Sequence, residues 1–591
     1  MKTLLSIILI GVVLLCSAQD IASIAKGDLL KGNGSLSFNQ IYYNTKGKSP
    51  SRNPYSYLLN GSINLKILGY IDAPFNFMYS NLGSQYTQPT FNQTSIHPRY
   101  KWVSTHFGSI ACNYSSYTVS GHLFQGSAID LTPGEFTFSA FYGRLQKAIP
   151  STELTNYNNA QPTYKRMGAG CKIGYSSDKV GHWNLVLFSA KDLASSITPP
   201  SIGELILPKQ NWSGSLQMNK RVLKKLNINA EWAYSLLSEN NQLNLKNEAM
   251  PIFLQFKSSN SSTALYKAIK TGFSYAIGSG ALQFNYQRVD PFYRTLGAYY
   301  FTNDLENISG GFTLPFLKGK INLTANLGVQ HDNIDQTKLS TMNRMVGNAN
   351  IQMQIHKKVN MNFNYSNFTS YTNVRPYTDY QNQINPYLAW DTLNFRQISQ
   401  NFTSFIALQL KSDSLKITTL THSLTYQIAA DQQNQKITSN HAFFNANLAF
   451  AHQRIKSGQT IAFSLNAGRT LLNERQLLNI SPFLNVTQPL FNKRLKPTLS
   501  AGYTSSIYNG ISSGGTFNTR CILNYTVQKV HQFTLAILML HRKDNPTTSL
   551  YTHQSRSSET TISLVYAVNM EFFNIKLNKK DKGALPKNEN L

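Results

Sequence analysis

Apolar and polar residues alternate along many short segments of this chain. In the segment 320–331, KINLTANLGVQH, every second position from Ile321 to Val329 is apolar, and Asn, Thr or Gly stands between them. Successive side chains of a β-strand point to opposite faces of its sheet, so a period of two predicts a strand with one apolar and one polar face. The segment also has about the 9–11 residues that a tilted strand needs to cross a membrane.

The same alternation recurs along the whole chain. Clear further examples are 282–287, 351–356, 359–365, 444–450, 461–468 and 562–572. The polar positions hold mostly Asn, Gln, Ser, Thr and Gly, whereas a sheet facing bulk water would carry many Lys, Glu and Asp. A polar face with few charges is typical of the hydrated interior of a transmembrane barrel, and aromatic residues at the segment ends predict interfacial girdles.

Glycine-containing turn signals separate these segments. They are Asn60-Gly61, Pro133-Gly134, Gly278-Ser279-Gly280, Ser309-Gly310-Gly311, Asn509-Gly510 and Ser512-Ser513-Gly514-Gly515. We therefore predict an all-β fold, a single large antiparallel transmembrane β-barrel of about 24 strands within a range of roughly 20–26. Binding or gating is expected in its longer loops. These loops are predicted at 191–212, 238–262, 288–306, 370–394 and 543–558.

The first residues have the layout of a secretory signal peptide. Lys2 is followed by an apolar stretch up to Leu15, and Cys16-Ser17-Ala18 places small residues at a cleavage site after Ala18. Cys16 also raises a lipoprotein interpretation, which Leu15 disfavours because a small residue should precede a lipidated cysteine. The predicted organisation is a signal peptide at 1–18, a barrel at 19–577 and a polar C-terminal tail at 578–591.

Composition narrows the class of protein further. Hydrophobic residues make up 41% of the chain, too many for a disordered protein, while charged residues make up only 14% against about 25% in soluble proteins. After the signal no apolar run is long enough for a membrane-spanning helix. A soluble secreted β protein such as a propeller is the alternative fold, disfavoured by the lack of a repeat of roughly 40–50 residues.

Basic residues outnumber acidic ones, 55 Lys and Arg against 27 Asp and Glu, for a net charge of +28. Export argues against a nucleic-acid partner. Two interpretations remain open: the basic residues lie in turns and at the lipid–water boundary, where outer-membrane lipid and lipopolysaccharide would be their partners, or some line a lumen and favour anions.

Candidate chemistry is sparse, and we predict no catalytic, cofactor-binding or metal-ligating residue. The histidines lack metal-binding spacing. Asp290 and the Asp304/Glu306 pair are interpreted as turn formers, the sequence 510–514 (GISSG) as a turn and the serines around His553 as coincidence. Cys112, Cys171 and Cys521 allow at most one disulfide, Cys112–Cys171.

The region 51–147 resembles the N-terminal part of a group of Bacteroidota outer-membrane β-barrel proteins, most of unassigned function. The residues that carry the resemblance are Pro54-Tyr55, Pro74-Phe75, Pro98-Arg99-Tyr100-Lys101-Trp102, Tyr117-Thr118, Gly121-His122, Pro133-Gly134 and Tyr142-Gly143-Arg144. The resemblance implies fold and location in the cell envelope and transfers no functional residue. This motif either builds a constriction inside the barrel or a partner surface, or supplies turn and girdle residues.

The sequence thus predicts an outer-membrane pore or transport channel, porin-like and without enzymatic activity or cofactor. The alternative is a structural or accessory barrel of a surface-protein export or envelope assembly complex, with other envelope proteins as partners. An adhesin or a membrane-embedded hydrolase ranks lower. The sequence identifies neither the solute nor the residues that bind it.

Overall fold

A computed structural model describes residues 28–81, 92–150, 162–197, 206–244, 260–298, 302–337, 343–370, 396–433, 436–545 and 556–576. The predicted signal peptide and C-terminal tail lie outside these residues, as do His553 and nearly all of the predicted loop 370–394.

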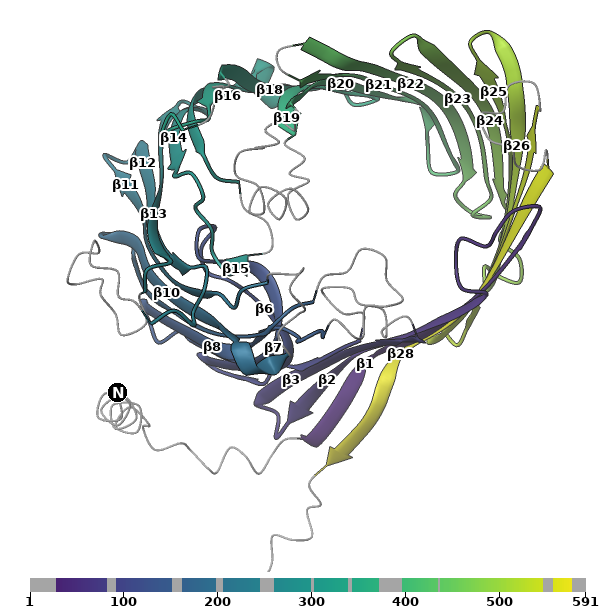
Figure 1. The fold of residues 1–591 in the computed structure, drawn as a ribbon. Helices are drawn as coiled ribbons and strands as arrows, with labels where there is room; N and C mark the ends of the chain where they lie inside the picture. Colours follow the sequence, from purple (N-terminus) through teal and green to yellow (C-terminus); the bar gives the residue numbers. More distant parts are fainter. Residues whose placement is uncertain are drawn as a thin grey trace, which may run out of the picture.

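The described residues form one sheet that closes into a ring (Figure 1). Its strands are β1 (Asp28–Lys46), β2 (Tyr55–Ile67), β3 (Ile71–Ser80), β4 (Gln93–Ile96), β5 (Arg99–Tyr100), β6 (Val103–Asn113), β7 (Val119–Leu131), β8 (Phe136–Gln146), β9 (Lys165–Ser177), β10 (Gly181–Leu193), β11 (Gln210–Val222), β12 (Leu226–Ser238), β13 (Thr263–Ile277), β14 (Gly280–Val289), β15 (Gly297–Ala298), β16 (Leu305–Phe316), β17 (Ile321–His331), β18 (Asn343–His356), β19 (Val359–Ser370), β20 (Arg396–Ser412), β21 (Lys416–Gln433), β22 (Lys436–Arg454), β23 (Thr460–Leu472), β24 (Arg475–Thr487), β25 (Leu495–Tyr508), β26 (Ile511–Val527), β27 (His531–Asp544) and β28 (Arg556–Lys576). The ring closes because β1 pairs antiparallel with both β2 and β28.

The ring contains 26 strand positions. Of the 28 strands in the sheet, β4 and β5 share one position between β3 and β6, and β15 lies outside the ring, so 28 minus 2 gives 26. Neighbouring strands of the ring are antiparallel. The prediction of an all-β antiparallel barrel is confirmed, and the strand number falls at the upper end of the predicted range.

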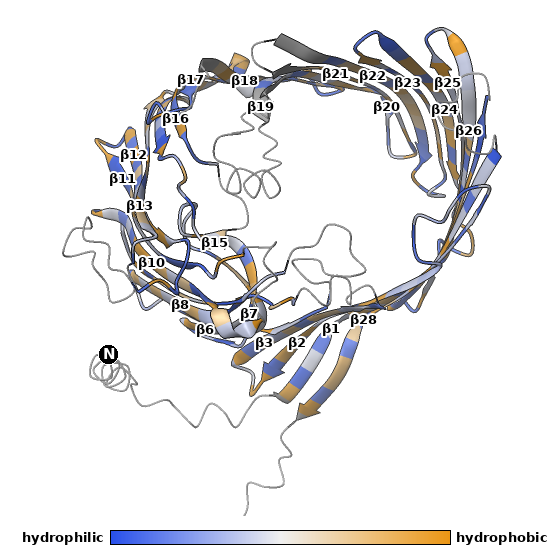
Figure 2. Cartoon of the chain, viewed as in Figure 1, coloured by the Kyte–Doolittle hydropathy of each residue, from blue (hydrophilic) through white to orange (hydrophobic). Residues whose placement is uncertain are grey.

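Hydrophilic and hydrophobic bands alternate along the strands (Figure 2), and because successive side chains of a strand point to opposite sides, this alternation separates the two faces of the wall. On β27, Phe533 and Met539 belong to the outer, apolar face and are more than two-fifths exposed. On the inner face, Thr534 donates a hydrogen bond to Asn524 of β26 at 2.7 Å. A closed barrel with an exposed apolar outer face is built to contact lipid, because neighbouring strands around the ring satisfy one another's backbone hydrogen bonds.

Uncharged side chains bond across neighbouring strands on the inner face from β16 to β26. Asn445 and Asn466 exchange two hydrogen bonds between β22 and β23, at 3.2 and 3.0 Å. Ser481–Thr504, Asn485–Ser500, Thr487–Thr498 and Asn479–Ser506 repeat this pairing on β24 and β25. The predicted polar interior is therefore a network of amides and hydroxyls.

The two ends of the barrel differ in the length of their connections. Asp28 of β1 pairs with Lys576 of β28, so the barrel wall begins and ends at one end of the barrel, where no connection exceeds the seven residues 488–494. We call this the short-turn end; the opposite, long-loop end includes 239–262 and 290–304. Basic residues gather in the short turns, in line with the first interpretation of the charge excess. They are Lys101, Lys179, Lys224, Lys225, Lys318, Lys320, Lys357, Lys358, Lys456, Lys493, Arg494 and Lys529.

Three of the six predicted turns are wrong. Asn60-Gly61 lies within β2, Ser309-Gly310-Gly311 within β16, and Ser512–Gly515 within β26, where a register shift follows Ser506. Glycine serves there to admit a neighbouring side chain: a Cβ on Gly61 would stand 2.6 Å from Leu36, and one on Gly515 2.2 Å from the Tyr503 hydroxyl.

The three described cysteines are free thiols. Cys112 is buried in the barrel interior, while Cys171 pairs with Leu187 on the outer face, so the two stand on opposite sides of the wall and the disulfide considered above does not form. Among the described residues, no helix is long and apolar enough to cross a membrane.

The assignment of the two faces predicts opposite effects of a charge at adjacent positions of β23. Leu465 faces outward near the middle of the strand, and Ser464 faces inward. We expect Leu465→Arg to lower the free energy of unfolding by about 2–4 kcal/mol, since it places a charge in lipid, and Ser464→Arg to change it far less. Urea unfolding of the folded barrel in lipid vesicles measures both; equal losses would contradict the assignment.

Candidate functional site in the barrel lumen

The β6–β7 hairpin leaves the wall at a row of three glycines. Gly108, Gly126 and Gly143 stand opposite one another on β6, β7 and β8, and β7 pairs with β8 only from Gln125 onward. Gly108 has a φ of +101°, and a Cβ on Gly126 would lie 2.2 Å from the carbonyl oxygen of Tyr142. Only glycine permits this conformation and this close approach, so the row marks where the hairpin bends.

Beyond the bend, the hairpin tip (residues 109–124) folds into the lumen and covers the inner face of the wall (Figure 1). Phe124 of the tip packs against Phe141 of β8 with ring centroids 4.7 Å apart, and Tyr114 contacts the same ring at 5.7 Å. Burial of each such aromatic side chain contributes about 1.5–3 kcal/mol. The buried cluster that results comprises Ile110, Cys112, Tyr114, Val119, Phe124, Ala128, Phe141, Leu145, Val186, Phe188, Ala190, Leu237 and Leu296.

Glycines of β9 make room for this cluster. The inner face of β9 carries Gly168 and Gly170, which stand beside Leu145 and Phe141. A Cβ on Gly170 would lie 2.4 Å from the Phe141 ring, and one on Gly168 2.5 Å from Leu145. The inner wall is therefore apolar where the tip covers it.

Polar contacts fix the end of the tip across β11 to β14. The amide of Gln217 donates to the Tyr114 carbonyl oxygen at 3.2 Å, and the Ser115 hydroxyl donates to Glu231 of β12. Gln287 of β14 donates to the Tyr117 hydroxyl at 3.1 Å. The tip thus spans several strands of the inner wall.

A second inward piece, the luminal segment (residues 290–298), comes from the connection between β14 and β16. Its β15 strand pairs in parallel with β7 of the tip, Gly297 standing opposite Val119. The Tyr293 hydroxyl donates to the Tyr117 carbonyl oxygen at 2.8 Å, and the Thr295 hydroxyl donates to that of Thr118 at 2.7 Å. The tip and the luminal segment therefore form one body inside the barrel.

Asn211 of β11 anchors this body to the wall. Its side-chain oxygen accepts a hydrogen bond from the Leu296 amide at 3.1 Å and lies 3.3 Å from the Thr295 hydroxyl oxygen. Its side-chain nitrogen donates to the Ser235 hydroxyl at 2.8 Å and the Leu236 carbonyl oxygen at 2.9 Å. Asn211 is fully buried, so each of these bonds satisfies a group that water does not reach.

The two tyrosines between the pieces remain hydrogen-bond donors at physiological pH. Burial, reinforced by the Glu231 carboxylate, raises the pKa of Tyr117 to about 12. Burial and the same carboxylate also raise the pKa of Tyr293. Neither hydroxyl ionises at neutral pH, so both keep the body neutral at these positions.

Below the bend, two histidines and a carboxylate form a chain on the inner face. His97 Nδ1 lies 2.8 Å from His106 Nδ1, His106 Nε2 lies 2.9 Å from Asp130 Oδ2, and His97 Nε2 lies 3.0 Å from the Ser95 hydroxyl. All three contacts are hydrogen bonds when His97 Nδ1 donates to His106 Nδ1 and His106 Nε2 donates to Asp130. His97 Nε2 then accepts from the Ser95 hydroxyl. The chain joins β4, β6 and β7 where the hairpin starts to bend.

This histidine pair is the feature that spacing along the sequence missed. His97 and His106 come together because β4 and β6 are neighbours, with Ser95 opposite Gly108. That register could have been proposed only after strand pairing was known. Within the described ranges, no group of three or more His, Cys, Asp and Glu residues could hold a metal ion.

The acidic residues considered in the sequence analysis form hydrogen bonds and an ion pair with nearby loops and strands. Asp290 accepts the Lys267 amide at 2.8 Å and Asp304 accepts the Ile334 amide at 3.0 Å. Glu306 accepts from the Tyr286 hydroxyl at 2.6 Å and pairs with His331 at 2.8 Å. The three carboxylates thus hold loops and neighbouring strands.

The motif in 51–147 divides between the two ends of the barrel. Tyr117-Thr118 and Gly121-His122 belong to the inward tip, whereas Pro133-Gly134 and Lys101-Trp102 lie in short turns. Gly143 belongs to the glycine row at the bend. One part of the motif therefore lies inside the barrel and another part in turns.

No protein-family model matches the sequence, and no curated protein matches it. Solved structures that the chain is similar to include the ferric preacinetobactin receptor BauA of Acinetobacter baumannii, at 10% identity and a TM-score of 0.36, covering 90% of this chain and 80% of that one. The FrpB iron transporter of Neisseria meningitidis has 9% identity and a TM-score of 0.37, covering 90% and 81%. Pseudomonas aeruginosa OpdQ has 10% identity and a TM-score of 0.32, and the match covers 75% of this chain and 98% of that one. Similarity at this level assigns neither a solute nor an activity to this chain.

The anchoring role of Asn211 gives a direct prediction. Asn211→Ala leaves the buried Leu296 amide and Ser235 hydroxyl without this partner, at a cost of about 1–3 kcal/mol. We expect hydrogen exchange at the Leu296 amide to accelerate roughly tenfold or more while the barrel stays folded. Asn445→Ala, on the opposite inner wall, is the matched control and should leave that amide unchanged. An unaffected Leu296 amide in Asn211→Ala would show that the luminal segment is held by other contacts.

Proposed function

We propose that this protein is an outer-membrane pore that passes polar solutes without enzymatic activity. The observation that carries the proposal is the pairing of a lipid-facing apolar outer surface with an inner wall of uncharged amides and hydroxyls. The apolar surface requires a bilayer, and the polar wall requires water inside it.

The size of the ring supports a water-filled interior. A barrel of 26 strand positions is wider than porins of 16–18 strands, which already leave an aqueous channel. Side chains of the wall alone do not fill such a space. The tip and the luminal segment then act as a fixed partial obstruction along the β6–β16 side.

The cross-strand network also supports passage of neutral polar molecules. Asn445, Asn466 and Ser481 present donors and acceptors without a net charge. Some charged groups of the inner face are paired with each other: near the tip Arg166 donates to Asp192 at 2.7 and 3.0 Å, and between β1 and β28 Lys31 pairs with Glu571 at 3.2 Å. A polar solute can replace its hydrogen bonds to water by hydrogen bonds to such a wall, so its entry into the lumen costs little free energy.

Single-channel conductance in a planar bilayer tests the proposal. The mature protein, purified in detergent and shown to be folded, is expected to give large and stable conductance steps. Absence of conductance from folded protein would mean a sealed lumen and would favour the accessory barrel of an envelope complex instead.

The obstruction predicts a gain of conductance when it is loosened. Replacing residues 293–298 by a Gly-Ser sequence of equal length removes the Tyr293 and Thr295 contacts, so we expect a larger unit conductance. The same exchange at 489–494, in a short turn, is the control and should leave conductance as in the natural protein. Equal conductance of the two variants would place the narrowest part of the pore elsewhere.

A further inference from the structure

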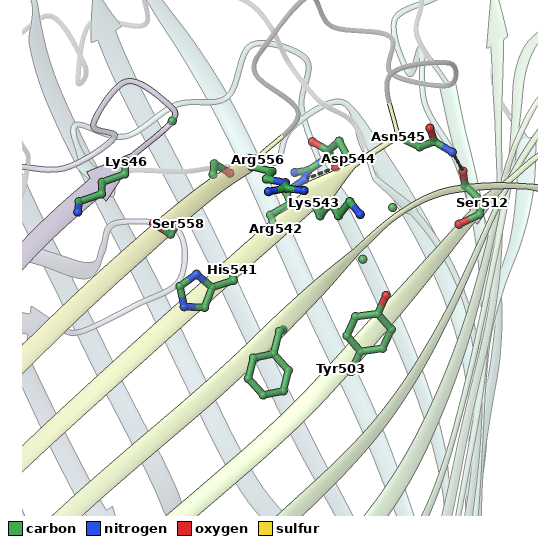
Figure 3. A pocket seen from close by; sticks show the side chains of 15 residues that line it. Lys46, Tyr503, Ser512, His541, Arg542, Lys543, Asp544, Asn545, Arg556 and Ser558 are labelled. Carbon is green, nitrogen blue, oxygen red and sulfur yellow. Dashed lines mark hydrogen bonds and ion pairs between the residues drawn. The ribbon is translucent and has the colours of Figure 1, made fainter.

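A cavity of about 860 Å³ lies on the wall near the long-loop end, across β25 to β28 and β1 (Figure 3). Most of the charged side chains in its lining are basic. Lys46 comes from β1, Lys543 and His541 from β27, and Arg556 from β28, and all four side chains are exposed.

Strand register places these residues on the lipid-facing side of the wall. His541 stands opposite Phe517 on one neighbour and Ser558 on the other, and Ser558 stands opposite Lys46. Residues in one such row share a face. On β27 the same face carries Phe533 and Met539. The basic residues therefore lie on the outer face, next to its apolar part and nearer the long-loop end.

The positive charges of this cavity are not neutralised by the part of the chain that the structure describes. Its one lining carboxylate, Asp544, pairs with Arg542 at 2.8 Å. Lys46, Lys543 and Arg556 form no ion pair with a described residue. The adjoining connections, 47–54 and 546–555, contain no Asp or Glu in their sequences.

Two of these cations stand directly opposite each other. Lys543 of β27 pairs with Arg556 of β28 in the ladder. Like charges at directly opposite positions destabilise a sheet unless an anion lies between them. The arrangement therefore favours a bound anion between these two side chains in the cavity.

Aromatic side chains lie on the same face just below the cations. Tyr503 and Phe517 stand opposite each other on β25 and β26, and they are 49% and 43% exposed. Aromatic rings at this depth mark the boundary between hydrocarbon and headgroups, so the cations lie at headgroup level. An anion with attached acyl chains fits both the cations and the aromatic side chains of this surface.

We propose that this outer-rim basic site binds the phosphate of a phosphorylated lipid headgroup in the outer leaflet. Lys46, Lys543 and Arg556 would contact the phosphate oxygens, Arg556 through its fork of N–H donors. Tyr503 and Phe517 would contact the acyl chains. The assignment does not depend on whether the lumen conducts, so its test is separate from the conductance measurement.

Native mass spectrometry of the full mature protein in a neutral, phosphate-free detergent tests the site. The probes are diphosphorylated lipid A, its dephosphorylated derivative and inorganic phosphate. The variant Lys46→Gln/Lys543→Gln/Arg556→Gln removes the site. Its control, Arg494→Gln/Lys496→Gln/Lys529→Gln, removes as many exposed charges at the short-turn end of the same region.

The natural protein should bind lipid A, and the site variant should bind it roughly tenfold more weakly or worse, while the control variant retains binding. The natural protein should bind the dephosphorylated derivative roughly tenfold more weakly than lipid A. This comparison uses the natural protein alone, so it does not depend on the folding of a variant. Equal binding of the derivative, or equal losses in both variants, would overturn the proposal. Inorganic phosphate bound as tightly as lipid A would identify a free-phosphate site and overturn the lipid assignment.

Discussion

The structure depends on one constraint: a backbone amide or carbonyl in lipid must find its hydrogen-bond partner within the protein. A sheet satisfies this only when its first and last strands meet, and β1 and β28 pair along nearly their whole length. Closure leaves the side chains to divide between lipid and lumen. The alternation read along the chain is the consequence, and the scarcity of charges follows because the outer face excludes them.

Closure at this strand number creates a second problem, since the ring is too wide for the side chains of its own wall to fill. Among the described residues, two segments of the chain occupy part of this space on one side of the ring. There the inner wall is apolar and glycine-rich, and the hairpin tip and luminal segment cover it, held by Asn211 and by the tyrosine and threonine contacts between them. From β16 to β26 the inner wall instead joins uncharged amides and hydroxyls of neighbouring strands. The described inner wall thus combines a packed side with a polar side.

The alternation predicted the barrel because it depends on local geometry alone, and segments such as 320–331 became strands as expected. Turn positions were less predictable: Gly61 and Gly515 are small to admit neighbouring side chains, a reason that appears only with the partner strand in place. The inward tip could not be predicted, since Phe141 and Phe188 have the spacing of any strand residue and only the register brings them under Phe124. The His97–His106 contact was missed for the same reason.

A pore with a hydrated polar wall must let small neutral solutes pass. Liposome swelling with sugars of increasing size measures this directly, without relying on ions. The account predicts rapid swelling with small sugars, slowing as the solute approaches the size of the space left beside the tip. Liposomes that hold folded protein and do not swell with any sugar would contradict it.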